Sequence, residues 1–230
     1  NSSNWKYQKD KNKLKEKHMK KIFTLCLLLV LSMIALTACK QEHHKTLIET
    51  SDTALLTLYT FDGSSESTMG LFNLGHAFVS IENISEDTIK IGKNALEPHK
   101  AITIGTWSIK AHFGVWYNVE SNYIKNHNKY DGRISVTCGI DNNDIATISK
   151  FIDNNDYWSP LHNCSQFALN LWNSVASTDE ELVTPVIYSP GKIAKSLKNF
   201  EVYETNRQIE TGDKMYYFDG DTPKYFELEK

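Results

Sequence analysis

The sequence contains no run of about 20 apolar residues and too few cysteines for a disulfide framework. Its longest apolar stretch, residues 22–36, is shorter than a helix needs to cross the hydrocarbon core of a bilayer. Of its four cysteines, Cys26 lies inside that stretch and Cys39 follows it, which leaves Cys138 and Cys164 for the rest of the chain. Because one pair cannot hold a cystine-rich fold together, a hydrophobic core must supply the stability.

Basic residues are scarce once the N-terminal segment is set aside. Residues 1–39 hold eight of the 25 Lys and Arg but only two of the 28 Asp and Glu. Residues 40–230 therefore carry 17 basic and 26 acidic side chains, a formal charge of −9. An acidic chain without a basic stripe gains little from neutralising phosphates, so we expect no nucleic-acid partner. No pattern indicates a cofactor, and the oligomeric state is left open.

The apolar stretch has the flanks of a secretory signal. Met19, Lys20 and Lys21 precede it, and Leu-Thr-Ala-Cys follows it at residues 36–39. A basic start, a short apolar segment and small residues before a cleavage point are typical of a signal peptide. Residues 36–39 resemble the bacterial lipobox, whose cysteine thiol receives diacylglycerol before the signal is removed. We therefore expect a lipoprotein signal peptide over residues 19–38 and a lipidated Cys39.

These expectations divide the chain into five parts. Residues 1–18 are rich in lysine, contain no methionine and are interpreted as upstream sequence. Residues 39–51 are expected to tether a domain to the cell envelope through the lipid, outside the cytoplasm. The remaining length suits one domain with a single core, which we place at residues 52–200. Residues 201–230 form a C-terminal extension with a hairpin signal at Asp219-Gly220.

Strands are predicted where β-branched and aromatic residues gather or alternate. In residues 75–83, Ala77, Val79 and Ile81 point to one face, while His76 and Phe78 point to the other. The stretch 107–123 is aromatic and reads as irregular. The predicted strands are residues 53–61, 75–83, 88–91 (returning antiparallel), 101–107 and 132–138, the first four forming a meander.

Three helices are predicted from caps and apolar spacing. Asp141 precedes a helix over residues 142–152, and Ser189-Pro190 opens a short third helix. The second helix begins near Asn163, with Ala168, Leu171 and Val175 along one stripe. Asn163 and Gln166 have the spacing of a capping box, which fixes the start of this helix.

Cys164 would lie in the first turn of the second helix. Unsatisfied backbone amides and the positive end of the helix dipole stabilise a thiolate there, and a lowered pKa makes a cysteine reactive. A cysteine on an apolar stripe also fits a plain core residue. His76, at the start of a strand beside Gly75, could supply the base that an activated cysteine needs.

At these residues the sequence resembles a known group. Gly75-His76-Ala77-Phe78, followed later by Asn163-Cys164-Ser165-Gln166-Phe167-Ala168, is similar to the circularly permuted NlpC-type papain-like proteins. That group includes cell-envelope hydrolases and the lecithin:retinol acyltransferase-like enzymes. The resemblance, over about residues 55–197, implies an α+β papain-like fold with an antiparallel sheet packed against the helix that bears the cysteine. It also implies Cys164 as nucleophile and His76 as general base.

A third polar group would orient the imidazole, and here the match is weaker. The group usually carries that residue on a strand soon after the histidine, but residues 88–91 contain no His, Glu or Gln. Glu120 is favoured, with Asn83 and His112 as alternatives. The backbone amide of Cys164 would be one oxyanion donor.

Three functions remain open. The first is a thiol hydrolase acting on an envelope substrate such as cell-wall peptide through an acyl-cysteine, and the second is a lipid acyltransferase or thioesterase of the same fold. The third is a non-catalytic envelope binding protein in which Cys138 and Cys164 form a disulfide. No metal is expected, because His162 and Cys164 lack a second ligand pair.

Overall fold

The computed structural model describes residues 49, 51–63, 75–177, 181–182, 189–212 and 214–226. The predicted signal peptide and the lipidation site at Cys39 lie outside these residues, as does most of the predicted tether. Among the described helices, none has both the length and the apolar character needed to cross a membrane.

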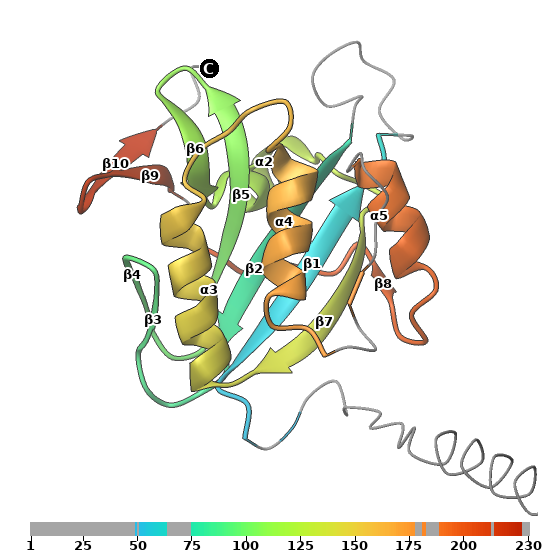
Figure 1. The fold of residues 1–230 in the computed structure, drawn as a ribbon, viewed down its shortest axis with the longest axis horizontal. Coiled ribbons are helices and arrows are strands. Elements are labelled where there is room, and N and C mark those ends of the chain that lie inside the picture. The colour runs from blue at the N-terminus through green and yellow to red at the C-terminus, as the bar shows by residue number, and fades with distance from the viewer. Residues whose placement is uncertain are drawn as a thin grey trace, which may run out of the picture. The chain divides into compact units, whose positions relative to one another are not determined.

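The described residues form a mixed α+β domain around one large antiparallel sheet (Figure 1). The sheet has eight strands in the order β10-β9-β6-β5-β2-β1-β7-β8. These strands are β1 (Ala54–Phe61), β2 (His76–Asn83), β5 (Ala101–Ile109), β6 (His112–Tyr117), β7 (Ile134–Ile140), β8 (Glu204–Thr205), β9 (Met215–Asp219) and β10 (Thr222–Phe226). A separate two-stranded sheet pairs β3 (Ile89–Ile91) with β4 (Asn94–Leu96).

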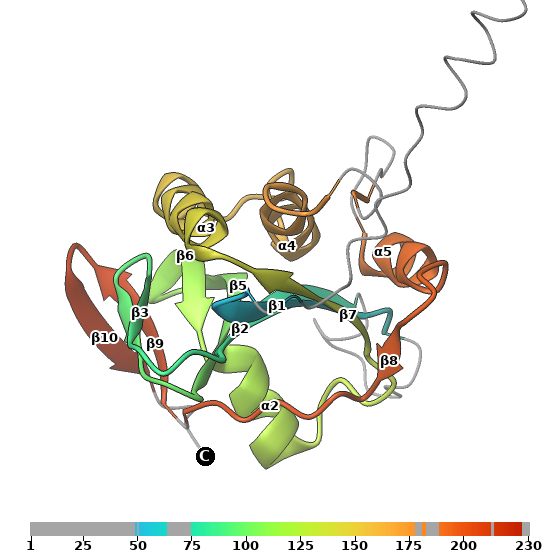
Figure 2. The same cartoon turned by 90° about the horizontal axis from the view of Figure 1, so that it is seen from below.

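Helices cover both faces of the sheet (Figure 2). On one face lie α3 (Asn142–Asn154), α4 (Cys164–Asn173) and α5 (Pro190–Leu197), and on the other lies α2 (Val119–His127). Helix α4 packs across the middle strands β2 and β5, while α5 packs on β1 and β7. The central strands are therefore buried from both sides, and β1 is buried along its whole length.

The alternation predicted for β2 is present. Ala77, Val79 and Ile81 join the main core, where they meet the buried stripe of α4 that contains Phe167 and Leu171. The other face of β2 carries His76, Phe78 and Ser80, and the Phe78 ring stacks on Tyr59 of β1 with centroids 4.8 Å apart. One face of β2 thus packs in the core beneath α4, and the other face packs in an aromatic layer on the side of α2.

The three predicted helices are confirmed, each with its N-cap residue, although Val175 lies beyond the end of α4. Asp141 accepts hydrogen bonds from the amides of Asn143 and Asp144, and Asp144 completes a capping box. Ser189 caps α5, whose first residue is Pro190. The capping box expected at α4 is only half formed. Asn163 accepts from two amides, but Oε1 of Gln166 does not reach back: it is buried and finds no hydrogen-bond partner in the part of the chain that the structure describes.

Two predicted strand arrangements are wrong. Residues 88–91 were expected to return along the meander, but β3 turns at Gly92 and pairs with β4 outside the main sheet. A left-handed backbone at Gly92 (φ 56°) allows that tight reversal. The stretch 107–123, predicted as irregular, contains the end of β5, all of β6 and the start of α2.

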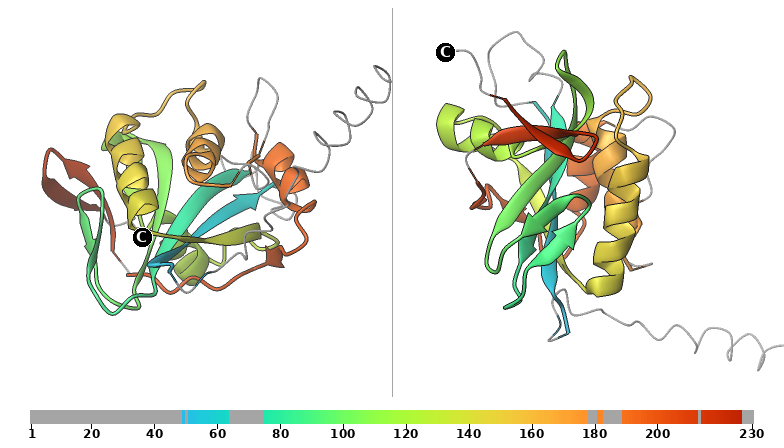
Figure 3. Two further views of the ribbon diagram at one scale, coloured as in Figure 1. Left: turned by 60° about the horizontal axis from the view of Figure 1, so that its bottom comes forward. Right: turned by 90° about the vertical axis from the view of Figure 1, so that its left-hand side faces the viewer.

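The C-terminal segment adds strands to both edges of the sheet. The hairpin β9–β10 forms at the predicted Asp219-Gly220 turn and extends the sheet beyond β6, whereas β8 pairs with β7 at the opposite edge (Figure 3). Met215 of β9 is buried in a small second core with Trp116 and Val119. This segment therefore supports the start of α2, where Val119 is the first residue.

Candidate active site

Cys164 is the first residue of α4, at the end of the sheet where β1 finishes and β2 begins. The side chain of Asn163 caps the helix by accepting hydrogen bonds from the amides of Ser165 (3.0 Å) and Gln166 (3.2 Å). The amide of Cys164 itself has no acceptor within the helix, because the first amides of any helix lack one. Cys164 as a whole residue is half-buried, while the apolar stripe that follows it is buried.

His76 is the first residue of β2 and lies opposite Phe61, the last residue of β1. The residue before it, Gly75, has a φ of 77°, and a Cβ there would collide with the carbonyl oxygen of Phe61. Only glycine fits this backbone comfortably. The surroundings of Gly75 thus give this glycine a structural role. The sharp turn sets the direction in which His76 enters the site.

Glu120 comes from the opposite face of the sheet, in the first turn of α2. Asn118 adopts a left-handed conformation (φ 60°) immediately before this helix, and its Oδ1 accepts a hydrogen bond from the amide of Thr103 (3.2 Å). The carboxylate lies over Gly105 of β5, where a Cβ would collide with Oε1. A left-handed asparagine and a missing side chain thus bring Glu120 into the interior, where it is fully buried.

The structure brings Cys164, His76 and Glu120 together in one line of contacts. Nε2 of His76 lies 2.9 Å from Oε1 of Glu120. The Cys164 thiol interacts with the imidazole of His76 through charge and a hydrogen bond. The same Oε1 accepts a hydrogen bond from the indole nitrogen of Trp107 at 2.7 Å. Trp107 and Tyr130 pack against the imidazole ring, with centroids 4.4 and 5.7 Å from its own.

Charges in this line of contacts change the acidity of both reacting groups. Burial acts to raise the pKa of Cys164, but the positive charge of His76, its hydrogen bond and the amide of Ala77 outweigh burial and lower that pKa. Burial acts to lower the pKa of His76, but the Cys164 thiolate and Glu120 raise it to about 10. Both shifts favour a thiolate next to an imidazolium, which is the reactive state of a cysteine nucleophile.

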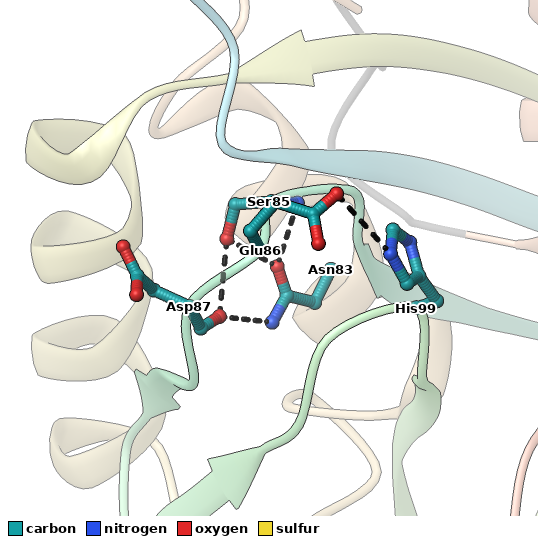
Figure 4. Close-up of polar contacts among 5 residues, drawn as sticks. All are labelled: Asn83, Ser85, Glu86, Asp87 and His99. Atoms are coloured by element: carbon teal, nitrogen blue, oxygen red, sulfur yellow. Dashed lines mark hydrogen bonds and ion pairs between the residues drawn. The ribbon is translucent and has the colours of Figure 1, made fainter.

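Asn83, one alternative for the third residue, is committed to a turn far from His76. Its amide nitrogen donates to the carbonyl oxygens of Asp87 (2.8 Å) and Leu96 (3.0 Å), and its Oδ1 accepts from Ser85 (Figure 4). Asn83 ends the strand that His76 begins, about 24 Å away at 3.4 Å per residue. It therefore cannot orient the imidazole.

His112, the other alternative, also has a partner elsewhere. Its Nε2 lies 2.7 Å from Oδ1 of Asp156, and its ring stacks on Tyr217 with centroids 4.7 Å apart. The same Asp156 oxygen accepts the amide of Val115, which ties β6 to the segment after α3. Of the three candidates, Glu120 is the one that the structure places against His76.

No disulfide joins Cys138 and Cys164. Cys138 pairs with Leu56 in the middle of β1. His76, which interacts with Cys164 and so marks its position, pairs with Phe61. Phe61 lies five residues further along β1, and His76 is on the other side of that strand from Cys138. That offset is about 17 Å along the strand, while a disulfide needs Cα atoms within about 7 Å. The pairing expected for a non-catalytic envelope protein is therefore wrong.

Within the part of the chain that the structure describes, no group of three His, Cys, Asp or Glu side chains is placed to hold a metal ion. Sequence reasoning allowed Trp107 as a core residue or as part of a substrate cleft, and it did not predict the contact with Glu120. Its spacing from Gly105, two positions apart on the same face of β5, was the available signal.

In comparisons with known proteins, no family model, curated protein or solved structure matched this chain.

Proposed function

We propose that this protein is a cysteine hydrolase or acyltransferase that works through an acyl-cysteine intermediate, with Cys164 as nucleophile, His76 as acid and base, and Glu120 orienting His76. The observation that carries the proposal is the line of contacts from the Cys164 thiol through the imidazole of His76 to a buried Glu120. The resemblance to permuted NlpC-type papain-like proteins is consistent with it, since the histidine precedes the cysteine. Membership of that family would imply a papain-like fold for this chain.

In the first half of the reaction, the Cys164 thiolate attacks the carbonyl carbon of an amide or ester. The C=O π electrons move to oxygen, where the amide hydrogen of Cys164 stabilises the new charge. The oxyanion then re-forms the carbonyl, the bond to the leaving amine or alcohol breaks, and the imidazolium of His76 gives that group its proton. The products are a thioester on Cys164 and a neutral imidazole.

The second half uses the change of charge made by the first. Among the groups that raise the pKa of His76, the Cys164 thiolate has the largest effect. Acylation removes the negative charge of this thiolate. Acylation has left the imidazole neutral, so it takes a proton from water or an acceptor alcohol as that oxygen attacks the thioester, and the imidazolium forms again. When the tetrahedral intermediate collapses, the new carboxylic acid or ester is released and the thiolate leaves beside the imidazolium. The arrangement thus turns His76 from an acid into a base at the step that needs one.

The substrate we propose is an acyl compound of the cell envelope, with amide bonds of cell-wall peptide first. The support for this class is the lipobox-like sequence at Cys39, which would hold the domain outside the cytoplasm. A lipid ester or amide is the second candidate, and the same chemistry would serve it. Hydrolysis and transfer differ only in whether water or another nucleophile reaches the thioester.

An activated ester such as p-nitrophenyl acetate tests the chemistry without knowledge of the substrate. We expect rapid p-nitrophenolate release, with an acetyl adduct on Cys164 detected by mass spectrometry of tryptic peptides. His76→Ala should slow acylation by roughly 10²- to 10⁴-fold, the range for loss of a general base. Cys164→Ser should abolish the adduct, whereas Cys138→Ser should leave it unchanged.

The pH dependence of alkylation gives a second reading of the same site. In the wild type, iodoacetamide should modify Cys164 well below pH 8.5, the ordinary thiol range, because the pKa of Cys164 is lowered. In His76→Ala the positive charge is lost and the apparent pKa should rise. A wild-type Cys164 that titrates like an ordinary thiol, or acetylation that goes mainly to Cys138, would sink the proposal.

A further inference from the structure

We propose that Trp107 is a positioning residue that fixes the Glu120 carboxylate for His76. The inference rests on the proposed function, because it concerns how the reactive pair is held. Its basis is a shared acceptor: Oε1 of Glu120 receives both the indole N–H of Trp107 (2.7 Å) and the Nε2 side of His76 (2.9 Å). Two donors that converge on one oxygen define its position better than either donor alone.

Strand β5 supplies both the space and the hydrogen-bond donor that hold this carboxylate. Gly105 leaves the space that Glu120 fills, and Trp107, two residues on and on the same face, supplies the donor. The other carboxylate oxygen, Oε2, is buried and has no hydrogen-bond partner among the described residues. Without the indole N–H, only the imidazole would hold the carboxylate, and the side chain could rotate about its terminal torsion.

The indole also shields the contact that it orients. Its ring lies 4.4 Å from the imidazole, and its far side stacks on Tyr123 with centroids 5.8 Å apart. Water is thereby kept from one side of the bond between His76 and Glu120, which strengthens that bond. Trp107 contacts both the Glu120 carboxylate and the ring of His76, so its effect on Cys164 has to pass through His76, either by way of the carboxylate or through the ring contact.

Trp107→Phe separates these contributions, because it keeps an aromatic ring and removes the N–H. The readout is the apparent pKa of Cys164, taken from iodoacetamide alkylation rates between pH 5 and 10. We expect that pKa to rise by about 0.5 to 1 unit, the order expected when one hydrogen bond to a charged group is lost two contacts away. Trp116→Phe is the matched control, since its indole donates to the carbonyl of His112 rather than to Glu120.

A double-mutant cycle with Glu120→Ala distinguishes positioning from packing. If Trp107 acts through the carboxylate, Trp107→Phe should add no further pKa shift in the Glu120→Ala background. An equal shift in both backgrounds, or no shift in the wild-type background, would overturn the inference. In both cases a low pKa for wild-type Cys164 would leave the proposed function standing, so the two failures are distinguishable. Thermal unfolding of each variant identifies any that fail to fold.

Discussion

Glu120 reaches the imidazole because position 105 has no side chain. Its carboxylate fills the space where a Cβ would otherwise lie, and from there it contacts both His76 and Trp107. The smallest residue of the site is therefore as important to its geometry as the charged ones. Glycine at this position serves a close approach rather than an unusual backbone angle.

Gly105→Ala should leave the fold in place and damage the site. The added methyl group meets the end of a flexible side chain, so the carboxylate of Glu120 has to move away from both of its donors. We expect the alkylation pKa of Cys164 to rise, with a loss of unfolding free energy of about 1–3 kcal/mol from overpacking. Denaturant unfolding and alkylation against pH measure the two effects.

Gly191→Ala is the matched control for this change. A Cβ there meets nothing closer than 3.9 Å, and the position lies in the first turn of α5. We expect stability to stay the same or rise by up to about 1 kcal/mol, as for other helical Gly→Ala changes, with alkylation unchanged. If Gly105→Ala alkylates like the wild type, Glu120 does not influence the thiol.

His76 and Cys164 could be found from the sequence because each opens an element with strong local signals. Glycine and alternation mark the start of β2, and asparagine followed by an apolar stripe marks the start of α4. Glu120 could only be chosen among three candidates. Its helix begins at a left-handed Asn118 with no side-chain cap, and that conformation is set by tertiary contacts that the sequence does not display.

At the scale of the element, the N-terminus of α4 combines a cap with a nucleophile, and substitutions at Asn163 can separate the two. Asn163→Ala removes the acceptor of two amides, so we expect a loss of about 1 kcal/mol of unfolding free energy. Asn163→Asp keeps the cap and should preserve stability, but it puts a negative charge beside Cys164. The pKa of Cys164 should therefore rise in the aspartate variant.

Thermal unfolding and alkylation rates should rank Asn163→Ala and Asn163→Asp in opposite orders. The alanine variant should lose more stability, and the aspartate variant should lose more thiol reactivity at pH 7. Identical reactivity in Asn163→Asp and the wild type would mean that the thiol is insulated from the helix start.

Elements with regular periodicity were predicted well, and the others were missed for a physical reason. In α3, α4 and α5, the caps and the apolar spacing lie within a few residues of one another. By contrast, α2 carries few apolar residues, and β6 presents its aromatic residues without clear alternation. The pairing of β3 with β4 depends on a turn at Gly92 that competes with the longer meander, so local sequence alone could not decide between them.

At the scale of the whole molecule, the expected lipid on Cys39 is the property to test first. Incubation of producing cells with radiolabelled fatty acid should label the wild type and leave Cys39→Ala unlabelled. Cys164→Ser serves as the control, because it alters the other reactive thiol and should keep the label. Equal labelling of the wild type and Cys39→Ala would contradict the lipobox interpretation and remove the support for an envelope substrate.

The direction of β1 sets how such an anchor would be used. The chain enters the sheet at Ala54, while the thiol lies near the other end of that strand, beyond Phe61, about 24 Å away at 3.4 Å per residue. An attachment that acts on the chain just before β1 would therefore act at the end of this strand opposite the thiol. A change in residues 40–51 would then alter the attachment and leave the site itself unchanged.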